Sequence, residues 1–444
     1  RDLREKAFKA WVKRAEKTGP DGNPAILSKA IELRTELASL LGFESYADYA
    51  LSETMAKTPD AVSALLTPVW QAAKERADEE RDALQSRARG SGQNEPLEAW
   101  DWRYYAEQER KAQFDIDESE IRPYLELNNM IAAAFHVAGR LFGLKFKELE
   151  DAERYHPDVR VFEVTDRKGE HVALFYGDYF ARSSKRSGAW MSRFRAQHKL
   201  GGKTTRPIIV NVLNFARGGD GEPTLLSFDD AHTLFHEFGH GLHGILSDVT
   251  YPSLSGTAVS RDFVELPSQL YEHWLSEPEI LREFAKHYKT GKPIPKSLLK
   301  RLKAADTFNQ GFATVEYTAC ALVDMAIHAN GTGKPVKPSA FEKKTLNNLG
   351  MPSEIVMRHR LPHFMHIMGG YAAGYYSYMW SEVMDADAFA AFKEAGDIFD
   401  PKTAKRLKDH IYSTGNTQDP EQAYLAFRGR PPSIEGLLKK RGFA

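Results

Sequence analysis

The stretch SFDDAHTLFHEFGHGLHGIL, residues 227–246, contains a complete H-E-x-x-H pattern at His236, Glu237 and His240. On a helix, positions i and i+4 lie on one face, so two imidazoles can hold one zinc ion while the adjacent glutamate reaches the water on it. Apolar residues recur at steps of four and three along this stretch, and they are Ala231, Phe235, Phe238, Leu242 and Ile245. The stretch therefore predicts a buried helix that carries a metal site.

A catalytic zinc ion needs a third protein ligand and one open position for water. The best candidate is Glu265, which residues 241–264 separate from His240. Pro267 is tolerated in a helix mainly in the first turn, so we expect Glu265 at or near a helix start. Gly239 costs about 1 kcal/mol relative to alanine within a helix, which predicts that another element packs closely there.

Two further histidines are rival ligands, because His232 lies four residues before the first imidazole and His243 three residues after the second. We favour hydrogen-bonding or packing roles for both. A carboxylate that accepts a ligand imidazole N–H is also expected. Asp229, Asp230 and Glu272 are the candidates, and Glu272 shares a helix face with Glu265 at i+7.

Most of the remaining sequence indicates helix. Residues 59–89 have the period of an amphipathic helix, within which Pro68 predicts a kink or a local break. Residues 155–180 are typical of a β-hairpin, and residues 207–215 add another β-rich run. We therefore expect a mainly helical protein with a small antiparallel sheet. A helical region over residues 1–150 and a catalytic region over residues 151–444 are expected to form one continuous body.

Composition excludes several classes of protein. The 444 residues are 42% hydrophobic and 27% charged, and the formal net charge is −1, which gives no electrostatic argument for a nucleic-acid or membrane partner. No apolar run is long enough to span a membrane. The single cysteine, Cys320, cannot form an intrachain disulfide, which fits a reducing compartment, and we expect a cytoplasmic location. We also expect a monomer. Because the sequence begins with Arg1 and not Met, we expect it to lie within a longer polypeptide.

Two strings carry a resemblance to a known family: FHEFGH at residues 235–240 and GTAVSRDFVELPSQLYEHW at residues 256–274. They resemble the zinc metallopeptidase family of thimet oligopeptidase, oligopeptidase A and the bacterial peptidyl-dipeptidases. The likeness extends over nearly the whole chain. The peptidyl-dipeptidase branch is the most similar, through AKTPDAV at residues 56–62, YHPDVRVFEV at 155–164, ALFYGDYFAR at 173–182 and HIMGGYAAGYYSYMW at 366–380.

The resemblance implies a helical gluzincin fold with a small sheet beside a deep substrate channel. It implies that His236, His240 and Glu265 bind one zinc ion per chain and that Glu237 is the general base. Many other zinc peptidases carry an aspartate four residues after the glutamate ligand, where this sequence has Gln269. The resemblance also implies that relatives have a further N-terminal helical region that forms part of the channel wall.

A tyrosine-rich segment gains a function from the resemblance. The segment contains His366, Tyr371, Tyr375 and Tyr378 together with several glycines. The spacing of its aromatic residues alone favours a place in the core over a catalytic role. The resemblance instead implies that Tyr371 and Tyr378 donate hydrogen bonds to the scissile carbonyl or the substrate backbone, with His366 as their partner.

The expected function is a peptidyl-dipeptidase that releases C-terminal dipeptides from short peptides, and it requires a group that binds the terminal carboxylate. Arg358, Arg360 and Tyr375 are candidates, although solvated surface charge explains the two arginines equally well. The stretch ALFYGDYF, with Gly177 as a candidate substrate-binding residue, is expected to be an edge strand that pairs with an extended peptide. An endo-acting oligopeptidase and a non-catalytic zinc- or peptide-binding protein remain alternatives, and the intact Glu237 argues against the latter.

Overall fold

The computed structural model describes residues 1–219, 221–332 and 335–444. The chain folds into two compact units: unit 1 comprises Arg1–Asp115, Lys303–Trp380 and Ile434–Ala444, and unit 2 comprises Ile116–Leu302 and Ser381–Ser433. Each unit is assembled from segments that are far apart in the chain. Within the described residues, every helix is too short or too polar to cross a membrane.

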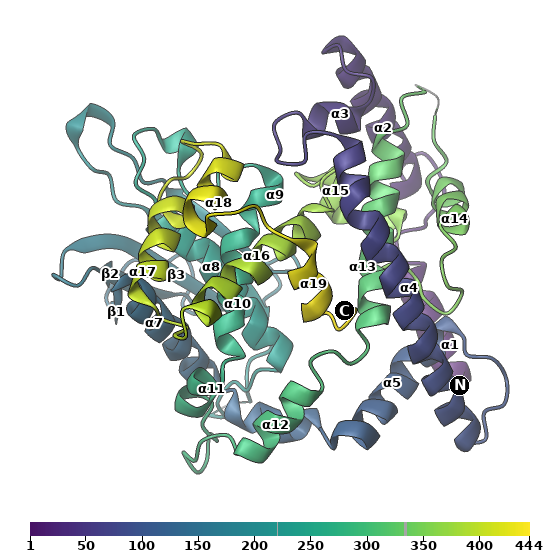
Figure 1. Ribbon diagram of the computed structural model, residues 1–444, viewed down its shortest axis with the longest axis horizontal. Helices are drawn as coiled ribbons and strands as arrows, with labels where there is room; N and C mark the ends of the chain where they lie inside the picture. Colours follow the sequence, from purple (N-terminus) through teal and green to yellow (C-terminus); the bar gives the residue numbers. More distant parts are fainter. Residues whose placement is uncertain (220, 333–334) are drawn as a thin grey trace. The chain divides into compact units, whose positions relative to one another are not determined.

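Helices build unit 1 (Figure 1). They are α1 (Asp2–Val12), α2 (Asn23–Leu40), α3 (Tyr46–Leu51), α4 (Pro59–Gly90), α5 (Ala99–Phe114), α13 (Gln310–His328), α14 (Pro338–Asn348), α15 (Met365–Met368) and α19 (Ile434–Lys440). The predicted helix over residues 59–89 is confirmed, and α4 continues through Pro68 without a break. α13 packs along α4, whose Glu80 carboxylate accepts the backbone N–H groups of Gly311 and Phe312 at 2.9 Å each.

Unit 2 combines helices with a five-stranded sheet (Figure 1). Its helices are α6 (Glu118–Ile121), α7 (Leu127–Phe142), α8 (Phe228–Ile245), α9 (Arg261–Val264), α10 (Leu266–Leu275), α11 (Pro278–Phe284), α17 (Pro401–Leu407) and α18 (Pro420–Arg428). The strands are β1 (Lys145–Glu148), β2 (Arg160–Thr165), β3 (His171–Phe180), β4 (Trp190–Arg195) and β5 (Ile208–Phe215). The chain passes between the units four times: after Asp115, within α12 (Lys296–Ala304), within α16 (Ser377–Glu394) and after Ser433.

The sheet has the strand order β1-β2-β3-β5-β4. The predicted hairpin is confirmed, because β2 and β3 pair antiparallel with Phe162 opposite Phe175. The small sheet is mixed: the expected antiparallel pairing joins β1 to β2, β2 to β3 and β4 to β5, whereas β3 and β5 are parallel. β5 lies between β3 and β4 and pairs antiparallel with β4. The alternation of side chains along β5 shows which of them share a face of the sheet, but it does not show that β3 is the strand on its other side.

The prediction that ALFYGDYF is an edge strand is also wrong. β3 is the central strand, and Gly177 stands opposite Arg160 of β2 on one side and Asn211 of β5 on the other. The backbone N–H and C=O groups of a strand that pairs with two neighbours are already hydrogen-bonded, so they cannot pair with an added strand. The edges of the sheet are β1 and β4.

An aromatic cluster joins α8 to the sheet. Phe135 of α7 stacks on Phe146 of β1 with ring centroids 4.1 Å apart. Phe238 of α8 lies 5.3 Å from both Phe135 and Phe175 of β3, centroid to centroid. The predicted apolar stripe of α8 is buried, as expected for a helix whose one face packs on a sheet.

A second packing contact of α8 is with α10, which runs beside it (Figure 1). A Cβ atom placed on Gly239 would lie 2.7 Å from both the carbonyl oxygen of Pro267 and the Cα of Ser268. The expectation that an element packs closely at Gly239 is confirmed, and it is the backbone of α10 that does so.

We predict that Gly239→Ala destabilises unit 2 by about 1–3 kcal/mol, because the added methyl forces two backbone segments apart. Gly241→Ala is the matched control, since its Cβ would meet no atom closer than the Asn211 side-chain oxygen at 3.3 Å. Denaturant unfolding of the two variants measures the difference, and equal free energies of unfolding would contradict the close packing described.

Candidate metal centre

α8 begins at a capping box. The Ser227 hydroxyl accepts the backbone N–H of Asp230 at 3.0 Å, and the Asp230 carboxylate accepts the backbone N–H of Ser227 at 3.0 Å. The helix then places His236 and His240 one turn apart, with ring centroids 4.9 Å from each other. The H-E-x-x-H pattern therefore lies on a helix, as the sequence predicts.

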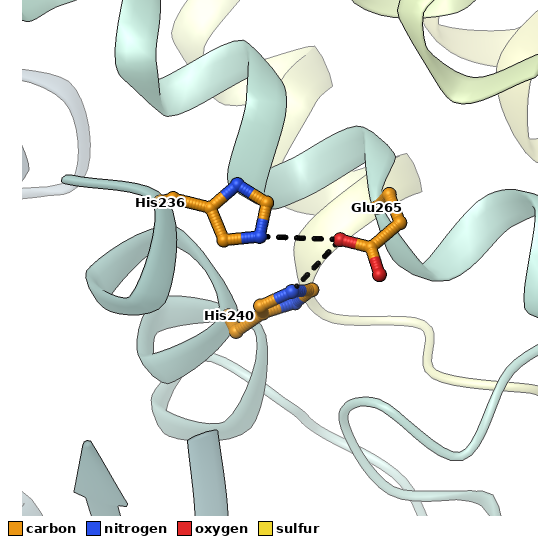
Figure 2. A group of neighbouring side chains, drawn as sticks. All are labelled: His236, His240 and Glu265. Atoms are coloured by element: carbon orange, nitrogen blue, oxygen red, sulfur yellow. Dashed lines mark hydrogen bonds and ion pairs between the residues drawn. The ribbon is translucent and has the colours of Figure 1, made fainter. Parts of the chain in front are cut away.

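Glu265 lies at the junction of α9 and α10, which confirms that it stands at a helix start. Its Oε2 atom is 3.3 Å from Nε2 of His236 and 3.1 Å from Nε2 of His240 (Figure 2). The ligand atoms of the three residues lie within 4.8 Å of one another, and Glu265 is 2% exposed. Two imidazole nitrogens and one carboxylate oxygen converging on one point form a donor set that fits a divalent metal ion.

The electrostatics of this group suit a cation. Burial by itself raises the pKa of the Glu265 carboxyl, but the two imidazoles outweigh burial and hold that pKa well below its usual range. Burial likewise lowers the pKa of His236, but the Glu265 and Glu272 carboxylates outweigh it and hold that pKa well above the ordinary value. Positive charge between these groups is therefore stabilised, which is the condition for binding a metal cation.

Glu272 orients the first imidazole. Its Oε1 atom lies 2.6 Å from Nδ1 of His236, which leaves Nε2 of the ring directed at Glu265. Of the three acceptors proposed from the sequence, Asp230 serves the capping box and Asp229 is exposed. Glu272 is thus the carboxylate that fixes the ring and its tautomer. The i+7 spacing from Glu265 identified the helix face, but spacing alone did not choose among the three.

Ser268 supports the carboxylate ligand and was not predicted. Its hydroxyl lies 2.8 Å from the carbonyl oxygen of Glu265 and 3.2 Å from the Oε2 atom of the same residue. The side chain is fully buried. A serine three residues after a candidate ligand, in the first turn of a helix, is the sequence signal that indicates such support.

Glu237 follows the first imidazole ligand in the chain and is buried, being 5% exposed. Its Oε2 atom accepts no hydrogen bond within the described parts of the chain. Burial raises the pKa of Glu237 above its ordinary value, although His236 and His240 oppose the shift. A buried carboxylate with a raised pKa has the proton affinity that a general base requires.

The rival histidines take other places. His232 lies 3.5 Å from Oε2 of Glu272 through its Nδ1 atom. His243 is completely buried, its ring centroid lies 6.1 Å from that of Tyr412, and neither ring nitrogen has a hydrogen-bond partner within the described chain. Burial, with a smaller contribution from His240, lowers the pKa of His243 to about 3. Neither residue belongs to the group of three ligand atoms.

The predicted tyrosines and His366 gather within unit 1. Tyr371 and Tyr378 stack with ring centroids 5.2 Å apart and an interplanar angle of 8°. The His366 ring lies 5.9 Å from Tyr371, 6.1 Å from Tyr378 and 5.1 Å from Tyr375. Tyr375 is the buried member of this cluster, and burial raises the pKa of its hydroxyl above the ordinary value.

The two candidate arginines differ in their surroundings. Arg360 donates to Glu342 at 2.8 Å and pairs with Glu16, so its guanidinium is already held by two carboxylates. The Arg358 side chain is exposed, and its backbone N–H donates to the carbonyl of Glu316.

The fold and the ligand group define a metallopeptidase architecture, and comparison of the sequence with known families agrees. The profile of peptidase family M3 matches residues 1–443, and the chain belongs to this family. It is 41% identical to dipeptidyl carboxypeptidase of Escherichia coli over 450 residues and 38% identical to oligopeptidase A of the same organism over 452 residues.

These alignments cover 100% and 99% of this chain but only 65% and 66% of the two relatives, so the chain spans just under two thirds of their length. Among solved structures, a Pyrococcus furiosus carboxypeptidase is similar at a TM-score of 0.56 and 13% identity, over 100% of this chain and 78% of that one. Trypanosoma cruzi metallocarboxypeptidase 1 is similar at a TM-score of 0.55 and 10% identity, over 94% and 77%. At these identities the likeness concerns the fold alone.

We predict that Glu272→Gln weakens metal binding about 10–100-fold, because an amide holds the His236 ring less firmly than a carboxylate and supports its basicity less. Competition with a chelator of known affinity measures the dissociation constant. Asp229→Asn is the matched control, since it removes one negative charge from the exposed start of the same metal-binding helix. Equal affinities of the two variants would show that Glu272 does not act through His236.

Proposed function

We propose that this chain is the catalytic part of a zinc-dependent peptidyl-dipeptidase that releases C-terminal dipeptides from short peptides. The observation that carries the proposal is the convergence of His236, His240 and Glu265 on one point, together with the buried Glu237. Membership of family M3 and the 41% identity to a dipeptidyl carboxypeptidase support the reaction class.

His236, His240 and Glu265 would hold one divalent ion, for which we propose zinc because the donor set is two nitrogens and one oxygen. When bound, such an ion lowers the pKa of water to about 7 and polarises a peptide carbonyl. The protein's part is to keep the three ligand side chains in place, which Glu272 and Ser268 do through hydrogen bonds.

Glu237 is the proposed general base. Its carboxylate accepts the proton of the attacking water and afterwards delivers that proton to the leaving amine, so it ends the cycle in its starting state. Its burial raises its pKa, which makes it a better proton acceptor than an exposed glutamate.

Tyr371 and Tyr378 are the proposed donors to the carbonyl oxygen that becomes negatively charged in the transition state, and His366 is their proposed partner. Their clustering within unit 1 supports a shared role. Loss of one such donor typically lowers the rate about 10²–10³-fold.

Release of dipeptides requires a group that binds the substrate's terminal carboxylate. We propose Arg358 ahead of Arg360, because Arg358 is exposed whereas Arg360 is engaged by Glu342 and Glu16. Tyr375 remains a candidate through its hydroxyl.

Strand β4 is the proposed site of backbone pairing with an extended peptide. It is an edge of the sheet, and the metal-binding helix packs against it. Met191 of β4 would contact a Cβ placed on Gly244 of α8. Pairing through the main chain selects little by side chain, and the net charge of −1 agrees with peptides of any charge as substrates.

We further propose a cytoplasmic monomer without nucleic-acid or membrane partners. The single, buried Cys320 and the balanced net charge support this placement. An endo-acting oligopeptidase on the same scaffold is the second candidate, favoured by the 38% identity to oligopeptidase A.

We predict that Glu237→Gln keeps the bound metal and loses peptidase activity about 10²–10⁴-fold, since the amide cannot accept a proton. Metal analysis together with a fluorogenic-peptide assay measures both properties. Comparable turnover in the variant would eliminate Glu237 as the base, and a bound metal without any peptide hydrolysis in the unaltered chain would indicate a non-catalytic binding protein.

Cleavage of one peptide with a free and with an amidated C-terminus distinguishes the two peptidase candidates. For a peptidyl-dipeptidase we expect the amidated peptide to be cleaved much more slowly, because the carboxylate contact is lost. Equal rates would favour the endo-acting oligopeptidase. Arg358→Gln should reproduce the loss with the free peptide and leave the amidated peptide unaffected.

A further inference from the structure

The segment that precedes Tyr378 has an unusual backbone. Residues 369–376 connect α15 to α16 through turns, and Ala373 has a φ of +53°, in the left-handed region that L-residues rarely adopt. A non-glycine residue keeps this conformation only where its surroundings over-determine it. A specific set of contacts must therefore hold this segment, which also carries Tyr371 and Tyr375.

Asp324 of α13 supplies the first contacts. Its Oδ1 atom accepts the backbone N–H of Ala373 at 2.9 Å, and its Oδ2 atom accepts the backbone N–H of Tyr375 at 2.9 Å. The residue is completely buried. One carboxylate thus spans the left-handed turn and satisfies the N–H groups on both sides of Gly374.

Two basic side chains, His328 and Arg34, lie next to Asp324. Nδ1 of His328 lies 2.9 Å from the backbone carbonyl oxygen of Asp324 and 2.8 Å from its Oδ1, and Nε2 of the same ring lies 3.0 Å from the guanidinium of Arg34. An arginine can only donate, so Nε2 accepts and Nδ1 carries the proton that is donated to the backbone carbonyl of Asp324. Arg34 also donates to the carbonyl of Ile367 at 2.7 Å, which ties the beginning of the segment to the same cluster.

Tyr317 of α13 provides a separate anchor. Its hydroxyl donates to the carbonyl of Tyr375 at 2.6 Å and accepts the backbone N–H of Met379 at 3.2 Å. Side chains of α2 and α13 therefore bind the backbone at four residues, two within the segment, Ala373 and Tyr375, and one on either side of it, Ile367 and Met379. Between the first and the last of these points lie Tyr371 and Tyr378, stacked on each other.

We propose that Asp324 is a positioning residue that sets the orientation of the Tyr371 and Tyr378 hydroxyls through the backbone of residues 373–375. This inference rests on the proposed function, in which these tyrosines stabilise the transition state. A buried carboxylate is costly unless its charge is compensated, and here the backbone of the tyrosine segment itself supplies two of the compensating donors. His328 lies beside the carboxylate, and Arg34 holds the His328 ring in place.

The test is Asp324→Asn, which keeps the size of the side chain but replaces one accepting oxygen with an NH₂ group. We expect kcat to fall about 10–100-fold with KM changed by less than about twofold, because a displaced donor affects the transition state and not substrate binding. The matched control is Glu80→Gln, a largely buried carboxylate that accepts two backbone N–H groups at the other end of α13. It should lose stability and retain kcat.

A double-mutant cycle separates positioning from a general structural role. If Asp324 acts through the tyrosines, Asp324→Asn combined with Tyr378→Phe or Tyr371→Phe loses little more than the tyrosine variant alone. Additive losses, or a kcat as high as that of the Glu80→Gln control, would overturn the proposal. Should Asp324→Asn fail to fold, Asp324→Glu keeps the charge but displaces the two accepting oxygens, and a kcat unchanged in that variant would equally overturn the proposal.

Hydrogen exchange makes the outcome independent of the proposed function. The amides of Ala373 and Tyr375 should exchange faster in Asp324→Asn than in the unaltered chain or in Glu80→Gln. If the unaltered chain has no peptidase activity, the proposed function is refuted. Faster exchange of these amides in Asp324→Asn would still show that Asp324 holds the segment. Unchanged exchange would refute that control whatever the activity.

Discussion

The metal centre depends on one contact, the approach of α10 to α8 at Gly239. The three ligand side chains come from α8 and from the start of α10, so the separation of these two elements sets the distance between the imidazoles and the carboxylate. The absence of a side chain at Gly239 lets the backbone at Pro267 and Ser268 come close. Glu265 then reaches both imidazoles, and Ser268 lies within reach of Glu265.

The same approach brings Glu272 to the outer nitrogen of His236, because residues i and i+7 share a helix face. One imidazole is thus held between two carboxylates from a single helix. Buried like charges are tolerated only where cationic or hydrogen-bonding groups compensate them. The two imidazoles provide this compensation in the protein: they hold the pKa of Glu265 below its usual range, and the carboxylates hold the pKa of His236 above its ordinary value.

Unit 1 uses a different device for its tyrosine cluster. A buried carboxylate from a neighbouring helix holds the backbone on either side of Gly374. In each unit the carboxylate comes from a helix. Glu272 of α10 holds the ring of His236, and Asp324 of α13 holds the backbone of the segment that carries Tyr371. Functional side chains on irregular backbone need such support, since irregular segments lack regular backbone hydrogen bonds of their own.

Elements with local causes were predictable from the amino-acid sequence. Apolar periodicity and the position of Pro267 are encoded within a few residues, so the buried helix at residues 228–245, the helix start at Glu265 and the β2–β3 hairpin were all expected. Ligand spacing likewise identified His236 and His240 and made Glu265 the best third candidate.

Long-range packing made the remaining choices. It placed β3 at the centre of the sheet and determined which strands lie beside β5. It also selected Glu272 over Asp229 as the partner of His236, and it brought Asp324 to the tyrosine segment. These pairings join residues that lie far apart in the chain. Their partners are chosen by packing and by the cost of burying an unpaired charge, which no local pattern of residues records.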